Sequence, residues 1–503
     1  MVDSSTIKKV VIVGGGTAGW MAAMYLNRFL KRQDCEITLI ESPSIETIGV
    51  GEATIPTLVR FIRNLDLDEK EFMRECHATY KLGIKFFDWI REDHAYWHPF
   101  GICGGLIDNI DLFHFWVKAT QSGIINEPYS AYSLQALVAD MGKSPCPIDG
   151  SSKIMDAGAY AYHLDAAAFA DYLKGKAIPS GVKHIYADVD QVLVNNNGYI
   201  TQVKTKDEQI IMADLFIDCT GFLGLLIEKT LDDSFVDWSS YLFCDKAVVL
   251  PLNRKEEIHP FTRATALDAG WCWQIPLINR LGCGYVYSSS HIEDEIAAQE
   301  LLNFTIYAET SNKEPRFLSM RVGHRQHFWK GNCISLGLSA GFVEPLESTG
   351  IFFIQHGLEL LMDYFPDKEL NPILIDTYNK RMTKAFEEVR DFIMLHYLIS
   401  QREDTSFWRD CCDIDLPDTL QTMLQMYAEA GILEGINIWV FPETSYFHIL
   451  SGGEFLPRRP WPMVNVSDFS KVLDILNNIK QRKLDMANSL PSYLNWLEST
   501  HLN

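Results

Sequence analysis

A glycine-rich turn that directly follows an apolar run constrains this chain more than any other feature. Residues Lys9 to Val13 are largely apolar and β-branched and predict a strand, and Ala18 to Leu30 predict a helix. Between them lies Gly14-Gly15-Gly16-Thr17-Ala18-Gly19. The first glycine permits a sharp turn, the third lets the backbone approach a pyrophosphate, and the last lets the helix pack on the strand. The segment predicts the start of a dinucleotide-binding fold, with the helix N-terminus facing the phosphates.

An acidic residue after the next strand agrees with that prediction. Glu36 to Ile40 predict a second strand, and Glu41 follows at the distance expected of the acid that holds a ribose hydroxyl. A glycine fingerprint alone is weak evidence, because such loops often do no more than close a turn. Strand, helix and acid agree here, so we predict a nucleotide site. Its predicted binding residues are Gly14, Gly16, Thr17, Ala18, Gly19 and Glu41.

Length and charge narrow the class of protein. With 503 residues, 47% of them hydrophobic, the chain is long enough for two or three domains. No run of about 18 apolar residues appears, so we expect a soluble cytoplasmic protein. The net charge of -22 argues against nucleic acid or an anionic membrane as a partner, because both require a cationic face. The 11 cysteines form no CxxC pair and no zinc-like pairing with histidine, so we expect no metal site.

The rest of the chain predicts an α/β nucleotide domain with an inserted sheet, followed by a mostly helical C-terminal region. Asn197-Gly198 lies between two strand-like runs and predicts a hairpin. Leu215 to Gly221 predict a strand that ends in a turn and can return the chain to the cofactor. The other predicted segments are a loop at Gly49 to Pro56, a strand-like run at Tyr80 to Trp89, and helices at Asp165 to Ile178, Ile351 to Tyr364, Tyr378 to Ser400 and Val466 to Leu484.

The spread of the predicted cofactor contacts favours FAD over a nicotinamide. A nicotinamide dehydrogenase needs a hydride-acceptor site near the fingerprint, whereas these contacts extend from Gly14 to Ile351. FAD is long and needs several loops to hold it. The further predicted contacts are Gly51, Glu52, Ala53, Asp218, Gly337 and Ile351.

Several motifs together resemble the flavin-dependent tryptophan halogenases. They are the glycine turn, the Gly49 to Pro56 loop, Tyr80-Lys81-Leu82-Gly83-Ile84-Lys85-Phe86, Gly270-Trp271-Cys272-Trp273-Gln274-Ile275-Pro276 and Gly341-Phe342-Val343-Glu344-Pro345-Leu346-Glu347-Ser348-Thr349-Gly350. The resemblance implies a Rossmann-like FAD-binding domain of the aromatic-hydroxylase type over residues 1–360. Inserted sheet segments belong to that domain, with part of residues 80–160 lining the substrate site. Residues 361–503 are then the helical substrate-binding region.

The resemblance also implies the reaction. Family members take reduced FAD from a separate NADH-dependent flavin reductase and use O2 with chloride or bromide to form hypohalous acid. The acid passes through an internal tunnel to a lysine, which directs it onto a small electron-rich aromatic. Indole, a substituted indole and tryptophan are the expected substrates. A homodimer is as compatible with the sequence as a monomer.

The reactive lysine falls on Lys81 by its position in the motif. A lysine amine is a compact cation on a flexible stem, able to hydrogen-bond hypohalous acid or to form a haloamine. Lys85, four positions on, is the alternative, and it also fits a solvated position on a strand.

The second predicted catalytic residue is Glu347. A carboxylate near the lysine can polarise the halogenating species and accept the proton that leaves the ring. A helix-capping acid is the simpler interpretation, because Ser348 and Thr349 are good N-cap residues. The resemblance assigns the backbone around Thr349 and Gly350 to the halide, in agreement with anion binding at a helix N-terminus.

The tryptophan motif has two interpretations as well. By the resemblance, its residues separate the flavin from the substrate and form the tunnel wall. Alternating aromatic residues in a strand are also typical of a sheet core. The predicted wall residues are Trp271, Trp273, Ile275 and Pro276.

The substrate site is predicted from two segments. His98-Pro99-Phe100 matches a family segment whose His and Phe enclose an indole ring. A histidine in an aromatic patch is also often structural. Glu454 and Trp461 are the C-terminal candidates, after Tyr446-Phe447, but their spacing departs from that of tryptophan-specific members. Indole, or an indole within a larger molecule, therefore fits at least as well as free tryptophan.

Two other functions share the same fold. An FAD-dependent aromatic monooxygenase would insert oxygen directly and would have no use for Lys81. A non-catalytic flavin-binding protein would leave both Lys81 and Glu347 incidental.

Overall fold

The chain folds into two compact units, and each unit contains three separate segments of the sequence. Unit 1 comprises Met1–Ala78, Leu164–Ser239 and Met320–Glu387, and unit 2 comprises Thr79–His163, Ser240–Ser319 and Glu388–Asn503. The computed structural model describes residues 5–45, 51–146, 160–253, 258–305, 314–436 and 439–502. The chain alternates between the units, so the functional residues of each unit come from distant parts of the sequence.

A six-stranded sheet forms the centre of unit 1. Its strands are parallel except at one edge, where β23 runs antiparallel to β24. In sheet order they are β10 (Lys183–Tyr186), β2 (Glu36–Glu41), β1 (Lys9–Val13), β14 (Leu215–Asp218), β24 (Cys333–Ser335) and β23 (Trp329–Lys330). Both β1 and β2 are buried over most of their length, as expected of strands covered on both faces. The predicted strands at Lys9 to Val13, Glu36 to Ile40 and Leu215 to Gly221 are confirmed.

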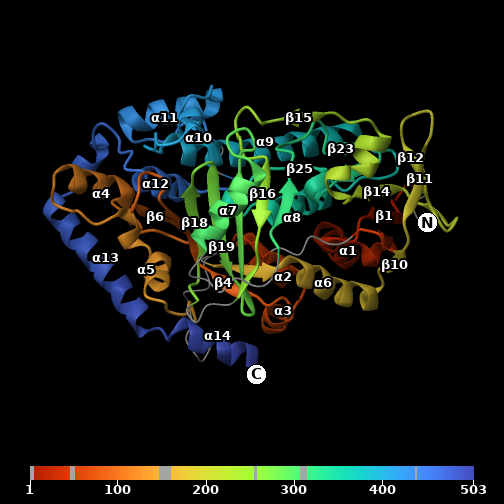
Figure 1. Cartoon of the computed structure of the whole chain (residues 1–503), viewed down its shortest axis with the longest axis horizontal. Coiled ribbons are helices and arrows are strands. Elements are labelled where there is room, and N and C mark those ends of the chain that lie inside the picture. Colours follow the sequence, from red (N-terminus) through yellow and green to blue (C-terminus); the bar gives the residue numbers. More distant parts are fainter. Residues whose placement is uncertain are drawn as a thin grey trace. The chain divides into compact units, whose positions relative to one another are not determined.

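Helices from three parts of the chain pack together in unit 1. Helix α1 (Thr17–Leu30) contacts α6 (Ala166–Ser180) and α8 (Gly350–Asp363), and α8 also contacts α2 (Thr57–Asn64). Figure 1 shows α1 beside β1, with which it is in contact. The predicted helix at Asp165 to Ile178 is confirmed, with Asp165 as its N-cap through bonds of 3.1 Å from two backbone amides. Helix α3 (Glu69–Glu75) contacts α6.

Smaller sheets complete unit 1. The predicted hairpin is confirmed: β11 (Val189–Val194) pairs antiparallel with β12 (Ile200–Thr205), and Gly198 in the connection has φ +79°. Strand β13 (Ile210–Met212) pairs with β12. A second sheet contains β15 (Phe235–Asp237), β22 (Gly323–Arg325) and β25 (Gly341–Phe342).

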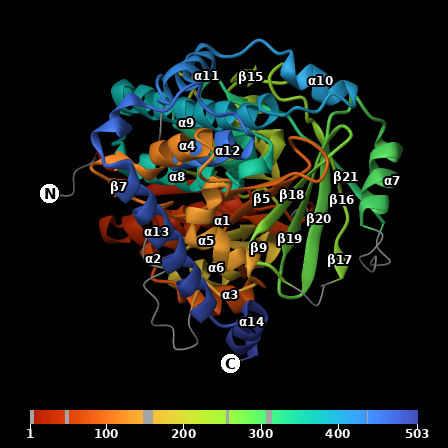
Figure 2. The same ribbon diagram turned by 90° about the vertical axis from the view of Figure 1, so that its left-hand side faces the viewer.

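An eight-stranded sheet forms the inserted sheet of unit 2. Its strands are β21 (Arg316–Ser319), β16 (Lys246–Val249), β20 (Arg280–Tyr287), β19 (Gly270–Pro276), β18 (Thr262–Leu267), β5 (Gly83–Phe87) and β6 (Ala95–Pro99), with β17 (Leu252–Asn253) beside β20. Only β18 and β5 pair in parallel; the other neighbours are antiparallel. Helix α7 (Asp294–Phe304) covers β16 and β20, as Figure 2 shows.

The strand-like run at Tyr80 to Trp89 is two strands rather than one. Strand β4 (Thr79–Lys81) pairs antiparallel with β9 (Ala161–Asp165), whereas β5 belongs to the large sheet. The break falls at Leu82, whose backbone N–H donates to the carbonyl of Pro260 at 2.7 Å. Alternation of side chains continues across such a break, so the sequence alone does not show it.

The region after Gly350 is mostly helical, as predicted. Its long helices cover the three amphipathic runs of the sequence. After α8 come α9 (Pro372–Leu398), α10 (Ser406–Cys412), α11 (Asp418–Ala430), α12 (Glu443–Gly452), α13 (Phe469–Ser489) and α14 (Tyr493–Leu502). Earlier in unit 2 lie α4 (Leu112–Gln121) and α5 (Leu134–Asp140), which α13 contacts. The α/β class with an inserted sheet and a helical C-terminal region is therefore confirmed.

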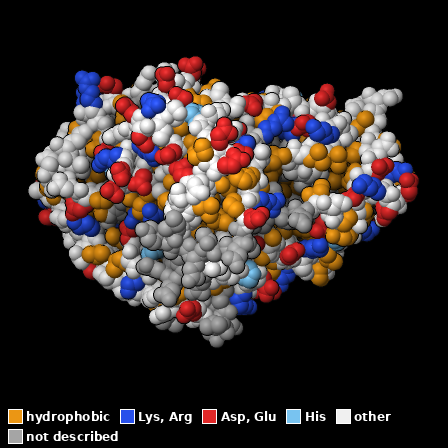
Figure 3. Space-filling model, in the orientation of Figure 1, with side chains coloured by type: hydrophobic (Ala, Val, Ile, Leu, Met, Phe, Trp, Pro, Cys, Tyr) orange, Lys and Arg blue, Asp and Glu red, His pale blue; other side chains and the backbone are white. Residues whose placement is uncertain are grey.

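Within the described residues we find no helix with the length and apolar character that crossing a bilayer requires. On the face shown in Figure 3, Lys and Arg side chains are scattered among Asp and Glu rather than gathered into one basic area. That face therefore offers no extended cationic surface for a polyanion.

Candidate active site

The glycine turn of unit 1 has the geometry that its sequence predicts. Gly14 has φ +118°, and a Cβ there would lie 2.2 Å from the carbonyl oxygen of Cys219. A Cβ on Gly19 would lie 1.9 Å from the carbonyl oxygen of Gly14. Around Gly16, in contrast, a Cβ would meet nothing within 4 Å. The turn is closely packed on the protein side and open at the one glycine expected to face a pyrophosphate.

The N-terminus of α1 is open in the same way. Gly16 is its N-cap and has no side chain to bond the first amides, and the first turn holds no acidic residue. Thr17 donates its hydroxyl to the carbonyl of Ala166 at 3.3 Å. Gly337 has φ +68°, and its Cβ would lie 2.8 Å from that of Ala18. The structure thus brings the predicted residues of the turn and Gly337 together, around amides able to bind an anion.

Glu41 lies beside this turn but already has partners. A Cβ on Gly15 would lie 2.2 Å from Cγ of Glu41. Its Oε2 accepts a hydrogen bond from Lys174 Nζ at 2.9 Å and lies 2.8 Å from His184 Nε2. Lys174 and His184 hold the carboxylate at the end of β2, and its other oxygen is the one suited to a ribose hydroxyl.

The loop predicted at Gly49 to Pro56 is only partly a loop. Gly51–Ala53 forms the short strand β3, in which Gly51 and Ala53 are buried and Glu52 is half-buried. Gly49 and Val50 lie outside the described residues.

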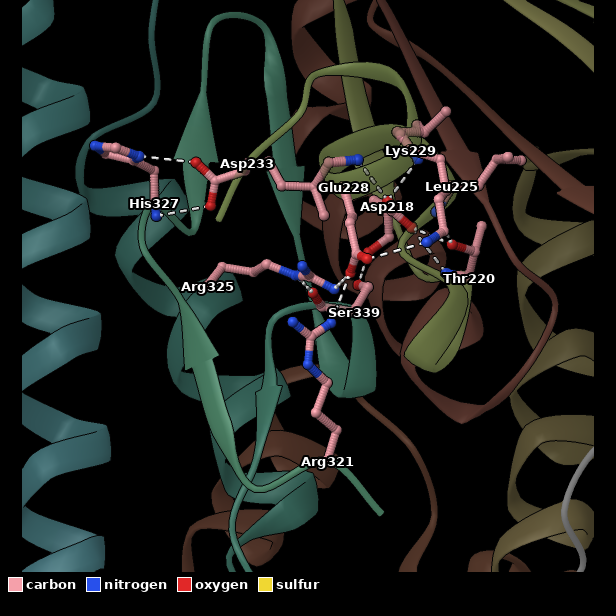
Figure 4. A network of polar contacts seen from close by, with 12 residues as sticks. Asp218, Thr220, Leu225, Glu228, Lys229, Asp233, Arg321, Arg325, His327 and Ser339 are labelled. Carbon is pink, nitrogen blue, oxygen red and sulfur yellow. Dashed lines mark hydrogen bonds and ion pairs between the residues drawn. The ribbon is translucent and has the colours of Figure 1, made fainter. Parts of the chain in front are cut away.

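Asp218 is fully buried, and both of its carboxylate oxygens are in use (Figure 4). Oδ1 accepts from the backbone and the hydroxyl of Thr220, at 2.9 and 2.6 Å, and Oδ2 accepts from the amides of Leu226 and Ile227, both at 2.8 Å. Burial acts to raise the pKa of this carboxyl, and these four bonds oppose the rise. Asp218 therefore stabilises the turn after β14. Its contact with a cofactor stays a prediction.

The same network extends to Arg325, which is almost fully buried. Its Nε donates to the carbonyl of Ser339 at 3.0 Å, and the hydroxyl of Ser339 donates to the carbonyl of Asp218 at 2.5 Å. Glu228 forms ion pairs with Arg325 and, at 3.0 Å, with Arg321. Figure 4 shows Arg325 and Arg321 pointing toward Glu228, beside Asp218 and Ser339.

A second open helix N-terminus in unit 1 follows Glu347. The short 3-10 helix η7 (Pro345–Glu347) ends there, Ser348 has φ +61°, and Thr349 is the N-cap of α8. No side chain caps α8, and the hydroxyl of Thr349 is buried with no hydrogen-bond partner in the described structure. A Cβ on Gly350 would meet nothing within 4 Å. The predicted capping by the Thr349 side chain is not seen, and the open amides and hydroxyl fit a small anion.

The other predicted residues of this segment are buried. Glu347 and Ile351 are 1% and 4% exposed. Both side chains are therefore shielded from bulk solvent.

Lys81 in unit 2 has no exposed surface. It lies in β4 opposite Ala161 of β9, and its Nζ is 5.2 Å from the centroid of the Phe100 ring. Lys85 is different: its Nζ forms an ion pair with Asp140 at 2.6 Å, and its side chain is 22% exposed. A buried amine beside an aromatic ring is the more suitable reactive group of the two.

The tryptophan motif forms strand β19. The rings of Trp271 and Trp273 have centroids 6.2 Å apart, and both side chains are buried. The ring of Trp273 covers Gly284, where a Cβ would lie 2.3 Å from it. Ile275 is also buried, and the carbonyl of Pro276 accepts a hydrogen bond from Thr79 at 2.6 Å. The four predicted wall residues thus form one closely packed strand.

The predicted substrate residues of unit 2 are dispersed. His98 packs against Phe392 and Phe441, at centroid distances of 5.4 and 6.2 Å, whereas Phe100 lies beside Lys81. Pro99, the residue between these two in the sequence, is buried at the end of β6. Trp461 packs on His114 at 4.9 Å.

Glu454 faces a separate cavity of about 490 Å³. Arg91 donates to both of its carboxylate oxygens, at 2.8 and 2.7 Å. The cavity is lined by Lys85, Tyr96, Trp97, Trp116, His448 and Glu454 among others, and neither Lys81 nor His98 is in its lining. Its size suits an aromatic molecule.

Comparison with known proteins identifies the family. Residues 9–468 match the family model of tryptophan halogenase. The chain belongs to the tryptophan halogenase family. It is 38% identical to the tryptophan 6-halogenase SttH of Streptomyces toxytricini, over 96% of both proteins. It is 37% identical to the tryptophan 7-halogenase RebH of Lentzea aerocolonigenes, over 99% of both.

Solved structures of flavin-dependent halogenases have the same fold. BrvH from Brevundimonas sp. BAL3 superposes with a TM-score of 0.92 at 37% identity, over 98% of this chain and 99% of that one. Xcc4156 from Xanthomonas campestris superposes with a TM-score of 0.93 at 37% identity, over 98% of each chain. This protein is accordingly a flavin-dependent halogenase, an oxidoreductase, and its family implies FAD.

The residues of unit 1 fit FAD. The space at Gly16, the uncapped N-terminus of α1 and the close approach of Gly337 to Ala18 leave a cradle at which a pyrophosphate can bind backbone amides. In this halogenase the residues Gly14 to Gly19, with Glu41 and the backbone beside Asp218, would hold the cofactor.

Proposed function

We propose that this halogenase uses reduced FAD, O2 and chloride or bromide to halogenate an indole, with Lys81 as the residue that delivers the halogen. The observation that carries the proposal is the fully buried amine of Lys81, 5.2 Å from the ring of Phe100. Family membership supports the flavin and the halide. A separate NADH-dependent flavin reductase is the proposed source of the reduced flavin.

When bound, reduced FAD would supply two electrons to O2 and the halide two more, so that one oxygen atom leaves as water and the other becomes the oxygen of hypohalous acid. The protein's own groups act afterwards. Either Lys81 donates a hydrogen bond to hypohalous acid, or its neutral amine exchanges one hydrogen for halogen and releases water. The ring then takes the halogen in place of a proton, and the amine is regenerated.

We propose that Glu347 accepts the proton that leaves the ring and that the N-terminus of α8 binds the halide. A buried carboxylate is a suitable acceptor for that proton. The unpartnered hydroxyl of Thr349 and the open space at Gly350 support a halide there. Trp271 and Trp273, with Ile275 and Pro276, are the proposed wall that keeps the substrate from reacting directly at the flavin.

The proposed substrate is an indole that lacks a free amino-acid head. The names of SttH and RebH give tryptophan as what those relatives act on. In this chain, Glu454 is held by two hydrogen bonds from Arg91. A carboxylate already paired with a guanidinium is a poor partner for an ammonium group. His98 and Phe100 are the proposed contacts of the ring, and Trp461 that of a larger substituent.

One assay tests the proposal. Purified protein is supplied with FAD, NADH, a flavin reductase and bromide, together with indole, substituted indoles and tryptophan, and the products are analysed by mass spectrometry. Brominated indole is the expected product, with less from tryptophan. Hydroxylated product would instead support the monooxygenase alternative, and no product from any aromatic would support a non-catalytic flavoprotein.

A further inference from the structure

A buried histidine is linked by hydrogen bonds to the strand that carries Lys81. His163 lies in β9 directly opposite Thr79 of β4, two residues before the lysine. Its Nδ1 is 3.1 Å from the hydroxyl oxygen of Thr79, and its Nε2 is 2.9 Å from that of Thr262. Thr79 in turn donates to the carbonyl of Pro276 at 2.6 Å. Both His163 and Thr79 are fully buried.

The direction of these bonds fixes the tautomer of His163. A carbonyl only accepts, so the single hydroxyl proton of Thr79 is used on Pro276. The hydroxyl oxygen of Thr79 therefore accepts from Nδ1–H of His163. In a neutral ring, Nε2 is then the acceptor, and Thr262 donates to it. One polarised chain runs from Thr262 through His163 and Thr79 to Pro276.

The charges around His163 keep it neutral. Its two partners are uncharged hydroxyls, and Lys81 is the charged group that acts on it. Burial and the positive charge of Lys81 hold the pKa of His163 well below its usual value. A neutral imidazole adds no second cation beside the amine.

The backbone of β4 has a second anchor. The phenol oxygen of Tyr493 accepts a hydrogen bond from the N–H of Tyr80 at 2.6 Å, and its hydroxyl donates to the carbonyl of Tyr80 at 3.1 Å.

This series of hydrogen bonds also connects two motifs that lie far apart in the sequence. Thr79 belongs to the lysine strand, and Pro276 ends the tryptophan strand. Thr262 begins β18, the neighbour of that strand. A shift of β4 would therefore break these hydrogen bonds. The cost in free energy is large because it would leave buried polar groups without partners.

We propose that His163 is a positioning residue for Lys81: as a neutral hydrogen-bonding link between Thr262 and Thr79, it fixes β4 against the tryptophan strand and so fixes the direction of the lysine amine. This inference rests on the proposed function of Lys81. It assigns to His163 no contact with the substrate or the flavin.

The test separates oxidant formation from halogen delivery. Thr262→Val removes the donor to Nε2 with little change of volume, and Thr262→Ser restores it. Thr265→Val is the matched control, a buried threonine of the same strand whose hydroxyl accepts from Arg263 instead. His163→Phe removes the link altogether. For each variant, FAD affinity is measured by flavin fluorescence, released hypobromous acid with a trapping reagent, and brominated indole by mass spectrometry.

We expect Thr262→Val to keep FAD affinity and oxidant release within about twofold of wild type while brominated product per oxidant falls about tenfold, because small displacements of a positioned group have large effects. Thr262→Ser and Thr265→Val are expected to match wild type. Should His163→Phe fail to fold, Thr262→Val and Thr262→Ser decide the question.

Two outcomes overturn the inference in distinguishable ways. If the wild type brominates indole and Thr262→Val does so with unchanged yield per oxidant, the positioning role of His163 is wrong and the proposed function stands. If the wild type yields oxidant but no brominated aromatic, the proposed function fails and takes the role of His163 with it.

Discussion

Gly19 lies so close to Gly14 that a Cβ on the first would be 1.9 Å from the carbonyl oxygen of the second. That oxygen belongs to the backbone at the end of β1, which is paired on both sides within the sheet. It cannot move aside as a flexible side chain can. Helix α1 therefore depends on a glycine here for its approach to the sheet, whereas Gly16 has open space around it.

We expect substitution by alanine to have different effects at these two glycines. We expect Gly19→Ala to lower the free energy of unfolding by about 1–3 kcal/mol, because the methyl group displaces α1. Gly16→Ala should leave that free energy nearly unchanged, since Gly16 has φ -79° and ψ -172°, which alanine adopts easily. It should instead weaken FAD binding. Urea unfolding and flavin titration measure both, and unaltered FAD affinity in Gly16→Ala would contradict the proposed pyrophosphate position.

A buried glutamate of unit 2 makes stability depend on pH. Glu388 accepts from the amides of Trp439, Val440 and Phe441 at 3.3, 2.9 and 3.0 Å. Burial nevertheless raises the pKa of Glu388 to about 7. The folded state then binds the proton more tightly than the unfolded state. The contribution to stability is complete below the ordinary pKa of a glutamate and is lost as the pH rises to about 7.

Glu388→Gln tests this sign. Between pH 4.5 and 7.5, the unfolding free energy of wild type should fall relative to that of the variant by about 3 kcal/mol. Only the change of this difference with pH is diagnostic, because the variant also alters the bonds to the three amides. A difference that stays constant, or that grows with pH, would show that the folded protein does not raise this pKa.

The local elements of the fold are predictable from the sequence because their signals are local. The strand before the glycine turn, helix α1 and the hairpin at Gly198 each depend on residues within a few positions of one another. The break at Leu82 is not predictable in this way, because its cause is a hydrogen bond to Pro260. Periodicity therefore locates strands but not the point at which one sheet gives way to another.

The hydrogen-bond partners of the site residues could not be predicted from the sequence for the same reason. Glu454 is a predicted substrate contact whose spacing departs from that of tryptophan-specific members, and its partner Arg91 is 363 positions away in the sequence. The sequence predicts a cofactor contact for Asp218, but it does not show that two amides of the following turn donate to this carboxylate. His163 lies in a short strand, and its role depends on contacts with Thr79 and Thr262, which are 84 and 99 positions away in the sequence.

Lys81 and Lys85 differ in a way that a pair of matched variants can test. Lys81→Met should keep FAD binding and hypobromous acid release but reduce brominated indole about a hundredfold, because the oxidant is no longer directed onto the ring. Lys85→Met should retain bromination. Its ion pair with Asp140 is worth only about 0.2–1 kcal/mol, and Asp140 keeps the bond from Trp97. Full activity in Lys81→Met, or its loss in Lys85→Met alone, would remove Lys81 from the mechanism.

The hydroxyl of Thr349 distinguishes a halide contact from simple packing. It is buried at the start of α8 and has no hydrogen-bond partner among the described residues. Thr349→Val nearly preserves the volume and removes an unsatisfied polar group, so stability should be unchanged or slightly higher. If the hydroxyl binds halide, the KM for bromide should rise by about tenfold or more, because one hydrogen bond to a charged group is lost. Thr349→Ser, which keeps the hydroxyl, should retain the wild-type KM. An unaltered KM in Thr349→Val would leave the halide to the backbone amides alone, and a large loss of stability would mean that the hydroxyl has a structural partner after all.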